Sequence, residues 1–587
     1  QSSLLPLVWA LDERMRGEWR RFWEAHGRLT QPAETLPGWL AGLGERTVDA
    51  SLALEALSWA RLLAAGVRVE QGLRQEFCAA VAKLAEAAGG DSTDGDSTDG
   101  DSTDDDFAAG DAGTGEATWL RMLLDVELPV TLVSLPPTRV AAARQTLDVV
   151  GDKLEGFVDE AIDAEGLPLV HTLPHFRPLL ASWIRSLQLA HGLSVDWPDD
   201  NLRSRFELTL YEALRLFRWD GSQVFDPLPA VATDLQANVE ADVAMWTAGL
   251  ELVAQTEHDR LARIVSERIG RSLSVAPRGG GKRKRSRGKT DESGAQQPIP
   301  SGYAEASQLA SLRTDWTRDG AHFALGFHAG RVFCELNARR ETVFSGEWTS
   351  RLIVDGREIE PVGDWQEHAW AEDEDADLLE LRRSFADGWS LERQVILLRD
   401  GRLLLIDDTL VGERHGLLEY SASVPLAPNI HFQSAAETTE AVLWGRTPLA
   451  MALPLYLPEW REEVGHVGGS TSSDTLAGEL TFADGRMVWT RRVSSNRLHL
   501  PLAIACDGRT SDSQYTWRRL TVTERMMYVP DSVAAGYRIQ LGGQQWLIYR
   551  SVAPIANRAV LGENLSCKYY VGGFHGAGKN KPLAGVD

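Results

Sequence analysis

Two histidines four residues apart are the first side chains in this sequence whose types and spacing could do chemistry. His171 and His175 lie in a short proline-containing stretch, and Arg177 follows two residues later. Histidine exchanges protons near neutral pH, and a nearby guanidinium could neutralise a negative charge. Pro174 and Pro178 fix the backbone around them, before an apolar run with helical spacing. The same pattern is typical of a turn that packs against a helix or caps it, so both interpretations stay open.

Arginine and tryptophan recur at helical spacing after these histidines. A guanidinium can hold a carboxylate through two parallel hydrogen bonds, and aromatic faces stack well on sugar rings. Such residues could hold a carboxylated sugar, although amphipathic helices packed against a second layer would show the same pattern. The candidate ligand-binding residues of this region are Arg177, Trp183, Arg185, Arg218 and Trp219.

Amphipathic helices are predicted to position these side chains. Apolar residues recur at intervals of three and four from residue 4 to about 88, and again from 118 to 269. Between them, residues 89–117 contain a repeated Gly-Asp-Ser-Thr-Asp unit without any apolar side chain. The aspartates lack the closing glutamate of an EF-hand loop, so the spacing favours a solvated insertion over a calcium site.

A change of pattern marks the second part of the chain. Residues 273–302 combine glycines, a basic cluster and a Ser/Gln/Pro stretch, which is typical of a linker. After about residue 303, short alternating runs are separated by turn residues, which indicates strands. We therefore expect an α+β multidomain chain, helical first and then a large antiparallel β-sandwich. The predicted segments are 1–88 (helical), 89–117 (acidic insertion), 118–272 (helical), 273–302 (basic linker) and 303–587 (sandwich).

Composition argues against several classes of protein. The chain has 587 residues and a formal net charge of −24, so a nucleic-acid binder, which needs a broad basic surface, is not expected. Its four cysteines form no zinc-like cluster, and no phosphate-binding or metalloprotease motif is present, so no cofactor is predicted. A structural divalent cation would still be compatible with the sequence. The apolar runs are too short for a transmembrane segment. The oligomeric state cannot be predicted.

The second half of the chain resembles heparinase II/III-like proteins. An Arg-x-x-Trp segment, strands separated by short turns, a Glu-Arg pair and a strand ending in aspartate follow one another in the order found in the β-sandwich of that family. A later stretch is similar to the version found in planctomycete-type bacteria. The resemblance covers about residues 303–574. The segments that carry it are 313–316, Trp348, Asp355-Gly356, Trp365, 378–381, 391–394, 403–408 and 515–550.

The resemblance implies an (α/α) toroid before the sandwich and, for lyase members, cleavage of uronic-acid polymers by β-elimination. That reaction needs a base for the C5 proton, a group that neutralises the adjacent carboxylate and an acid for the departing oxygen. The resemblance implies His171 or His175 as base or neutraliser and Tyr211 as acid, with an acidic polysaccharide as partner. It also favours a periplasmic or extracellular location in a bacterium.

The loop that contains the two histidines departs from the family pattern. Family members carry Ser-Pro-x-Tyr after the glycine of this loop, whereas residues 170–175 contain no tyrosine. The departure favours a second hypothesis, in which the protein binds carbohydrate or has a structural role on the same fold without catalysis. A third hypothesis is an interaction protein that uses the acidic insertion and the basic linker as tethers.

The predicted sandwich holds further candidate residues. His368, His431 and His466 are far apart in the sequence but could converge, and a lyase of this type can complete its cleft with a sandwich histidine. Of the three, His431 is the predicted substrate-binding residue. Asp407 and Asp408 follow an apolar strand and are interpreted as a turn pair.

Overall fold

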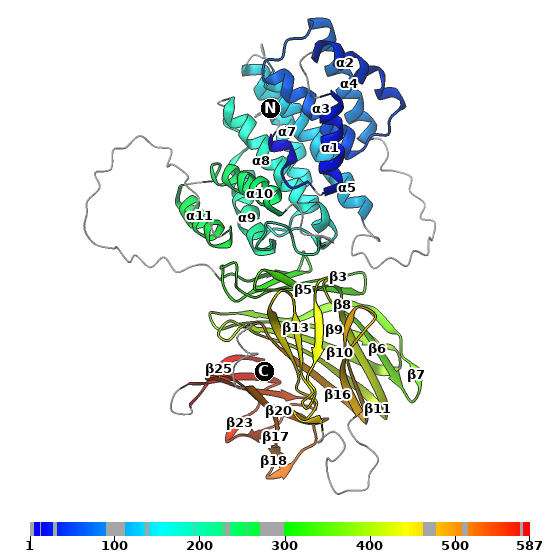
Figure 1. Cartoon of the computed structure of the whole chain (residues 1–587), viewed down its shortest axis with the longest axis vertical. Coiled ribbons are helices and arrows are strands. Elements are labelled where there is room, and N and C mark those ends of the chain that lie inside the picture. Colours follow the sequence, from blue (N-terminus) through cyan, green and yellow to red (C-terminus); the bar gives the residue numbers. More distant parts are fainter. Residues whose placement is uncertain are drawn as a thin grey trace, which may run out of the picture. The chain divides into compact units, whose positions relative to one another are not determined.

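The computed structural model describes residues 5–269 and 299–586, apart from 12, 27–31, 90–111, 136–139, 194, 227, 229–234, 254, 462–476, 508–514 and 576–578. The chain divides into two compact units (Figure 1). Unit 1 comprises residues 1–226 and 231–275, and unit 2 comprises residues 227–230 and 276–587. The acidic repeats, most of the basic linker and His466 lie outside the described residues, so the hypotheses about them stay predictions.

Unit 1 is helical, as the three- and four-residue spacing predicts (Figure 1). Helix α3 (Ala50–Ala64) is buried along almost its whole length, because apolar and small residues occupy every face. Helix α9 (Asp200–Leu216) begins where the Asp199 carboxylate accepts a hydrogen bond from the Leu202 backbone N–H at 2.9 Å. Among the described residues, no helix is long and apolar enough to cross a membrane. The other helical elements are η1 (Leu5–Val8), α1 (Glu13–His26), α2 (Pro32–Ala41), η2 (Leu43–Glu45), α4 (Gln71–Gly89), α5 (Ala112–Arg121), η3 (Met122–Glu127), α6 (Leu128–Val133), α7 (Val140–Ala161), η4 (Val170–His175), α8 (Phe176–Gly192), α10 (Leu235–Leu250) and α11 (Gln255–Ile269).

A buried ion cluster joins three helical segments of unit 1. Glu127, at the end of the π-helical turn η3, is fully buried. Its two carboxylate oxygens accept hydrogen bonds from Arg185 of α8, each at 2.7 Å, and Arg61 of α3 donates a third at 3.2 Å. Burial alone would raise the pKa of Glu127, but the two guanidinium groups outweigh it and lower that pKa. The carboxylate is therefore charged inside the unit.

Unit 2 is built from antiparallel sheets (Figure 1). In the described part of the chain, strands β1 to β5 form one sheet, an eleven-stranded sheet is the largest, and two smaller sheets of five and four strands follow. The first sheet contains β1 (Gly302–Ala304), β2 (Leu309–Arg313), β3 (His322–His328), β4 (Arg331–Ala338) and β5 (Glu341–Glu347). The large sheet contains β6 (Thr349–Val354), β7 (Arg357–Glu358), β8 (Pro361–Glu372), β9 (Ala376–Phe385), β10 (Trp389–Leu398), β11 (Leu403–Pro425), β12 (His431–Ser434), β13 (Ala441–Trp444), β14 (Pro448–Pro454), β15 (Ala477–Ala483) and β16 (Arg486–Ala505). The smaller sheets contain β17 (Tyr515–Leu520), β20 (Ala534–Leu541), β21 (Gln544–Ser551), β24 (Tyr569–His575) and β25 (Lys579–Val586), and then β18 (Val522–Glu524), β19 (Met527–Tyr528), β22 (Arg558–Val560) and β23 (Glu563–Leu565).

The large sheet is covered on both faces where β10 and β11 run side by side. Val395 and Leu397 pack in one apolar cluster with residues of β2 to β5, such as Phe323. Ile396 and Leu398, which point the other way, pack in a second cluster with residues of β17, β20, β21 and β24. A strand with two buried faces needs apolar residues at every position, which explains the continuous apolar runs in this region of the sequence.

The interpretation of Asp407 and Asp408 as a turn pair is wrong. Strand β11 continues through them to Pro425, and the turn lies before it, around residues 399–402. Asp408 is opposite Arg393 of β10, accepts two hydrogen bonds from it at 2.9 and 3.0 Å, and accepts a third from the Tyr420 hydroxyl at 2.7 Å. Asp407, on the other face, contacts His499 Nε2 at 2.6 Å. Partners distant in the sequence thus allow both carboxylates to lie inside a buried strand.

Asp531 makes the stability of unit 2 dependent on pH. Burial alone would raise the pKa of this carboxyl, but Arg491 and Arg519 outweigh it and hold the pKa at about 2. A depressed pKa contributes stability that is present above about pH 4 and is lost as pH falls towards 2. We expect Asp531→Asn to cost roughly 2 kcal/mol at pH 7 and almost nothing near pH 2, as measured by urea unfolding across this range. A cost that is the same at both pH values would contradict this assignment.

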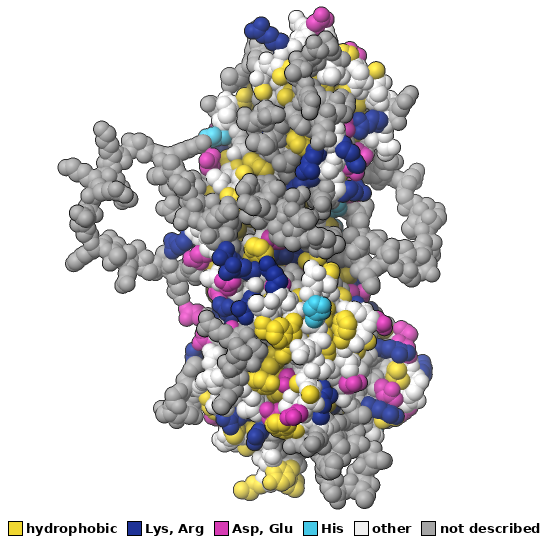
Figure 2. All heavy atoms as spheres, viewed as in Figure 1, with side chains coloured by type: hydrophobic (Ala, Val, Ile, Leu, Met, Phe, Trp, Pro, Cys, Tyr) yellow, Lys and Arg dark blue, Asp and Glu magenta, His cyan; other side chains and the backbone are white. Residues whose placement is uncertain are grey.

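A hairpin of unit 2 presents an exposed apolar tip, the projection at the foot of Figure 2. Strands β18 and β19 are joined by Arg525 and Met526, both with positive φ, of 51° and 66°. Met526, Met527 and Tyr528 are 99%, 68% and 81% exposed. Two successive residues with positive φ form the tight turn whose twist suits a hairpin.

Candidate functional site

The loop after α7 holds a compact turn that leads to the two histidines. Ile162 and Pro168 form an isolated antiparallel bridge, and Asp163 Oδ1 accepts hydrogen bonds from the backbone N–H groups of residues 165 and 167 at 3.0 and 2.9 Å. Gly166 has a φ of +91°, and a Cβ there would lie 2.8 Å from the backbone of Leu208. Only glycine fits this position without strain or a clash, so the turn is fixed against α9.

A similar turn follows α9. Phe217 and Gln223 form an isolated antiparallel bridge, the Asp220 carboxylate accepts a hydrogen bond from the Ser222 backbone N–H at 3.0 Å, and Gly221 has a φ of +86°. Aspartate side chains stabilise such turns because they accept from N–H groups two residues ahead. The sequence thus uses one turn design twice between successive helices.

Hydrogen bonds and an ion pair join the two turns. Gln223 donates a hydrogen bond to the Leu173 carbonyl oxygen at 2.5 Å, which connects the second turn to η4. Arg177, at the start of α8, pairs with the Asp226 carboxylate at 3.3 Å. Arg218 donates to the Asp226 carbonyl oxygen at 2.9 Å. Burial raises the pKa of Asp226, although Arg177 and Arg218 oppose the shift. Two predicted residues, Arg177 and Arg218, therefore meet at Asp226, where both are buried, with 8% and 4% of their surface exposed.

His171 and His175 both lie in η4 and are half-buried. The His175 ring is stacked on Trp119 of α5, with 6.2 Å between ring centroids and 20° between planes. Gly115 allows this approach, because a Cβ there would lie 2.8 Å from His175 Cδ2 and 3.3 Å from the His171 carbonyl oxygen. Helix α5 and the loop therefore hold the His175 ring in a defined orientation at the beginning of α8.

Tyr211 lies on α9 between two guanidinium groups. Arg215 donates to its hydroxyl oxygen at 3.2 Å, and the guanidinium carbons of Arg215 and Arg260 lie 4.7 and 5.3 Å from the ring centroid. Burial raises the pKa of Tyr211, against the opposing effect of Arg215. The phenol is therefore protonated at neutral pH, and the neighbouring cations would stabilise the phenolate that forms after it gives up its proton.

Trp183 and Arg185 lie in the interior of unit 1. Trp183 is 2% exposed, with its ring edge against Phe206 at 5.3 Å between centroids, and Arg185 is 2% exposed in the Glu127 ion cluster. A side chain without accessible surface has no face left for a sugar ring or a carboxylate. We therefore correct the prediction of a ligand-binding role for both residues and assign them to interior packing.

The remaining predicted residues are more accessible. Trp219 is half-buried in the second turn of unit 1. In unit 2, His431 is exposed on β12, and the side chain of His368 is 46% exposed with Nε2 at 3.7 Å from Glu380. Among the described residues, no group of three or more His, Cys, Asp or Glu side chains could hold a metal ion.

Four residues that contact the predicted residues of unit 1 could not be predicted from the sequence. Trp119 and Gly115 precede the histidine loop by more than fifty residues, and no local pattern connects them with it. Arg260 reaches Tyr211 from a helix that begins 44 residues later, and Asp226 is a lone acidic residue in a loop. Only tertiary contacts connect each of these residues with the predicted residue that it touches. Both turns contain an aspartate and a glycine, at 163 and 166 and at 220 and 221, which was the one signal in the sequence that relates them.

Comparison with known proteins gives a match in structure alone. No family model matches the sequence, and no curated protein matches it. The heparan sulfate lyase HepC from Pedobacter heparinus aligns with a TM-score of 0.53 and 10% sequence identity, over 93% of this chain and 84% of that chain. The heparinase III-BT4657 gene product aligns at 0.53 and 10%, over 89% and 75%. Another heparinase III structure aligns at 0.51 and 11%, over 92% and 83%. The chain therefore has a heparinase III-like fold over most of its length, as its resemblance to heparinase II/III-like proteins predicts.

Proposed function

We propose that this protein is a polysaccharide lyase that cleaves a uronic-acid-containing polysaccharide by β-elimination. The observation that carries the proposal is the likeness in fold to heparan sulfate lyases over 93% of the chain. The helical unit adds support, because the two histidines and Arg177 follow the first turn, and Tyr211 lies on α9, the helix that precedes the second turn. We also propose that the helices of unit 1 form a toroid of the (α/α) type. The two turns would then occupy equivalent positions in successive helix pairs.

The proposed reaction has two proton transfers, one from the carbon next to the breaking bond and one to the oxygen of that bond. A neutral imidazole, of His175 or His171, removes the C5 proton, and the electron pair left on C5 forms a double bond to C4. The bond between C4 and the glycosidic oxygen breaks, and the Tyr211 hydroxyl gives its proton to the departing oxygen. Neutralising the uronate carboxylate makes the C5 proton easier to remove, and the histidine of the loop that does not act as base is the proposed neutralising group.

The direct test is ultraviolet absorbance of the unsaturated uronate product. The purified full chain would be incubated with heparan sulfate, chondroitin, hyaluronan and alginate, each with and without a chelator of divalent cations. A rise in absorbance with one of these polymers supports a lyase, and its sensitivity to the chelator would test for a structural cation. A flat trace with all four would contradict the proposal for these substrates.

Tyr211→Phe is expected to lower kcat about a hundredfold with little change in KM. The substitution keeps the ring between Arg215 and Arg260 but removes the proton that the leaving oxygen needs. Steady-state kinetics with the cleaved polymer measure the effect, and circular dichroism checks that the helices are intact. An unchanged kcat would remove Tyr211 from the mechanism.

A non-catalytic carbohydrate-binding protein on the same fold is the second candidate. The observation that favours it is the absence of tyrosine from residues 170–175, together with the burial of Trp183 and Arg185. This candidate predicts a flat absorbance trace together with measurable binding of one of the polymers by calorimetry. Turnover of any of them would exclude it.

A further inference from the structure

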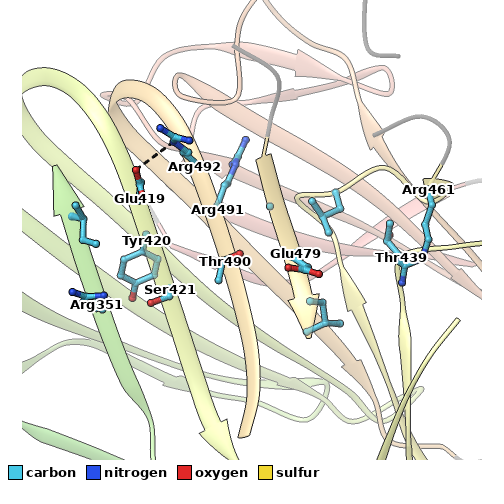
Figure 3. Close-up of a pocket in the computed structure, with 14 residues that line it drawn as sticks. Arg351, Glu419, Tyr420, Ser421, Thr439, Arg461, Glu479, Thr490, Arg491 and Arg492 are labelled. Atoms are coloured by element: carbon cyan, nitrogen blue, oxygen red, sulfur yellow. Dashed lines mark ion pairs between the residues drawn. The ribbon is translucent and has the colours of Figure 1, made fainter. Parts of the chain in front are cut away.

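A groove of about 670 Å³ lies on the large sheet of unit 2, where β6, β11, β16 and β15 run side by side (Figure 3). The apolar part of its lining consists of Leu457, Leu480 and Ile353. The rest of the lining is polar, with hydroxyl, carboxylate and guanidinium side chains. A concave surface with a few polar groups around apolar patches is typical of a ligand-binding site.

Strand register places four polar residues in one row across this groove. Arg351 of β6 is opposite Ser421 of β11, which is opposite Thr490 of β16, which in turn is opposite Glu479 of β15. Neighbouring strands are about 4.8 Å apart, so the row extends over roughly 14 Å. Side chains directly opposite one another share a face of the sheet, as Figure 3 shows for this row. The row offers a hydrogen-bonding group at every strand, along a line suited to a short oligosaccharide.

The two hydroxyl groups in the middle of the row are available to a ligand. Within the described part of the chain, the side chains of Ser421 and Thr490 make no hydrogen bond, and both residues are partly exposed. A hydroxyl both donates and accepts, as the hydroxyl groups of a sugar do. Glu479, at the end of the row, is exposed and can accept hydrogen bonds from sugar hydroxyls.

Guanidinium groups surround the row and could bind carboxylates. Arg492 pairs with Glu419 at 3.4 Å, and Arg351 pairs with Glu358 at 2.5 Å, both in exposed ion pairs. Exposed pairs of this kind are weak, so either arginine can exchange its partner for a ligand carboxylate at little cost. Arg461 makes no ion pair among the residues described and donates to the Ala435 carbonyl oxygen at 3.2 Å.

The mixture of charges selects among acidic glycans. Glu419 and Glu479 lie among the arginines, so a densely sulfated chain would meet repulsion at the same place where it gains attraction. A chain with one carboxylate per repeat and free hydroxyls elsewhere would satisfy both the arginines and the hydroxyl row. The lining therefore fits a carboxylated glycan of low charge density.

We propose that this groove is a binding site for an unsulfated, uronate-containing oligosaccharide. The choice of an acidic sugar rests on the proposed function, whereas the groove itself is built entirely from residues of unit 2. It would hold a segment of polymer through Arg351, Ser421, Thr490 and Arg492 without taking part in bond cleavage.

Calorimetry of the full chain with a hyaluronan oligosaccharide tests the groove. The background is the His175→Ala variant, so that cleavage does not consume the probe. Thr490→Val removes one hydroxyl while keeping the side-chain shape, and Arg351→Gln removes one cation. Each is expected to weaken groove binding about tenfold. Arg414→Gln is the matched control, because Arg414 is an exposed arginine on β11 whose partner is Asp387, and it should leave binding unchanged.

The outcomes separate this proposal from the proposed function. Binding that Thr490→Val and Arg351→Gln both leave intact would overturn the groove site, even if the chain is an active lyase. Binding that both variants weaken would support the groove, even if the absorbance assay stays flat and the lyase proposal fails. A heparin oligosaccharide that binds more tightly than hyaluronan, with the same sensitivity to both variants, would overturn the preference for low charge density.

Discussion

Replacing His175 with alanine is expected to lower kcat/KM for the cleaved polymer by about 10² to 10⁴-fold, the usual contribution of a general acid or base. The half-buried ring is held by its stack on Trp119 and by the close approach of Gly115, so its orientation at the start of α8 is defined. A base fixed in this way loses little entropy when it meets the substrate proton. The measurement is the initial rate of absorbance increase at several polymer concentrations.

The matched control for this variant is His191→Ala. His191 is exposed in the last turn of α8, the helix that begins directly after His175, so His191→Ala also removes one imidazole but leaves the histidine loop unchanged. We expect its activity to equal that of the unmodified chain. Full activity in the His175 variant would remove this histidine from the reaction and leave His171 as the remaining imidazole of the loop.

Glu127→Ala is expected to destabilise unit 1 by about 3 to 5 kcal/mol, because it leaves Arg61 and Arg185 buried without their shared carboxylate. The loss of helical signal in urea, followed by circular dichroism, measures the effect. Glu160→Ala is the control. Glu160 pairs with Arg121 at 3.3 Å on the surface, with both side chains about half-exposed, so its loss should cost less than about 1 kcal/mol. Equal costs for the two variants would contradict the role of the buried cluster.

The helices and strands were predictable because their apolar periodicity is local. The three- and four-residue spacing near residues 179–193 and 202–216 corresponds to α8 and α9, and the alternating runs after residue 303 correspond to strands. The pattern near residues 235–269 corresponds to two helices, α10 and α11. Periodicity reports which residues face a core, but it does not report which distant segment completes that core.

Charged residues inside the fold were harder to interpret for the same reason. Arg185 has the spacing of a residue on a polar helix face, and its burial depends on Glu127, which lies 58 residues earlier. Asp408 follows an apolar run, as a turn residue often does, and its place within β11 depends on Arg393 of the neighbouring strand. A buried charge is stable only with its partner, so its environment cannot be predicted without knowledge of that partner.

The groove residues gave no signal in the sequence. Arg351, Ser421, Thr490 and Glu479 come from four strands spread over about 140 residues, and each alone is an ordinary polar residue on a strand. Their alignment is set by strand register, which depends on the whole sheet. The histidine loop, by contrast, carries its candidate residues as a local cluster in the sequence.

The large sheet, which is covered on both faces, determines when unit 2 can complete its folding during synthesis. Strand β11 pairs with β6 and β10, which precede it, and also with β16, which ends at Ala505. The second face of the sheet is covered only by strands that come after residue 515. Until those strands emerge, the side chains of Ile396, Leu398 and Leu405 have no cover. A nascent or truncated chain that stops near residue 506 would therefore expose a broad apolar surface, of the kind that chaperones bind. The C-terminal strands are the segment that buries it.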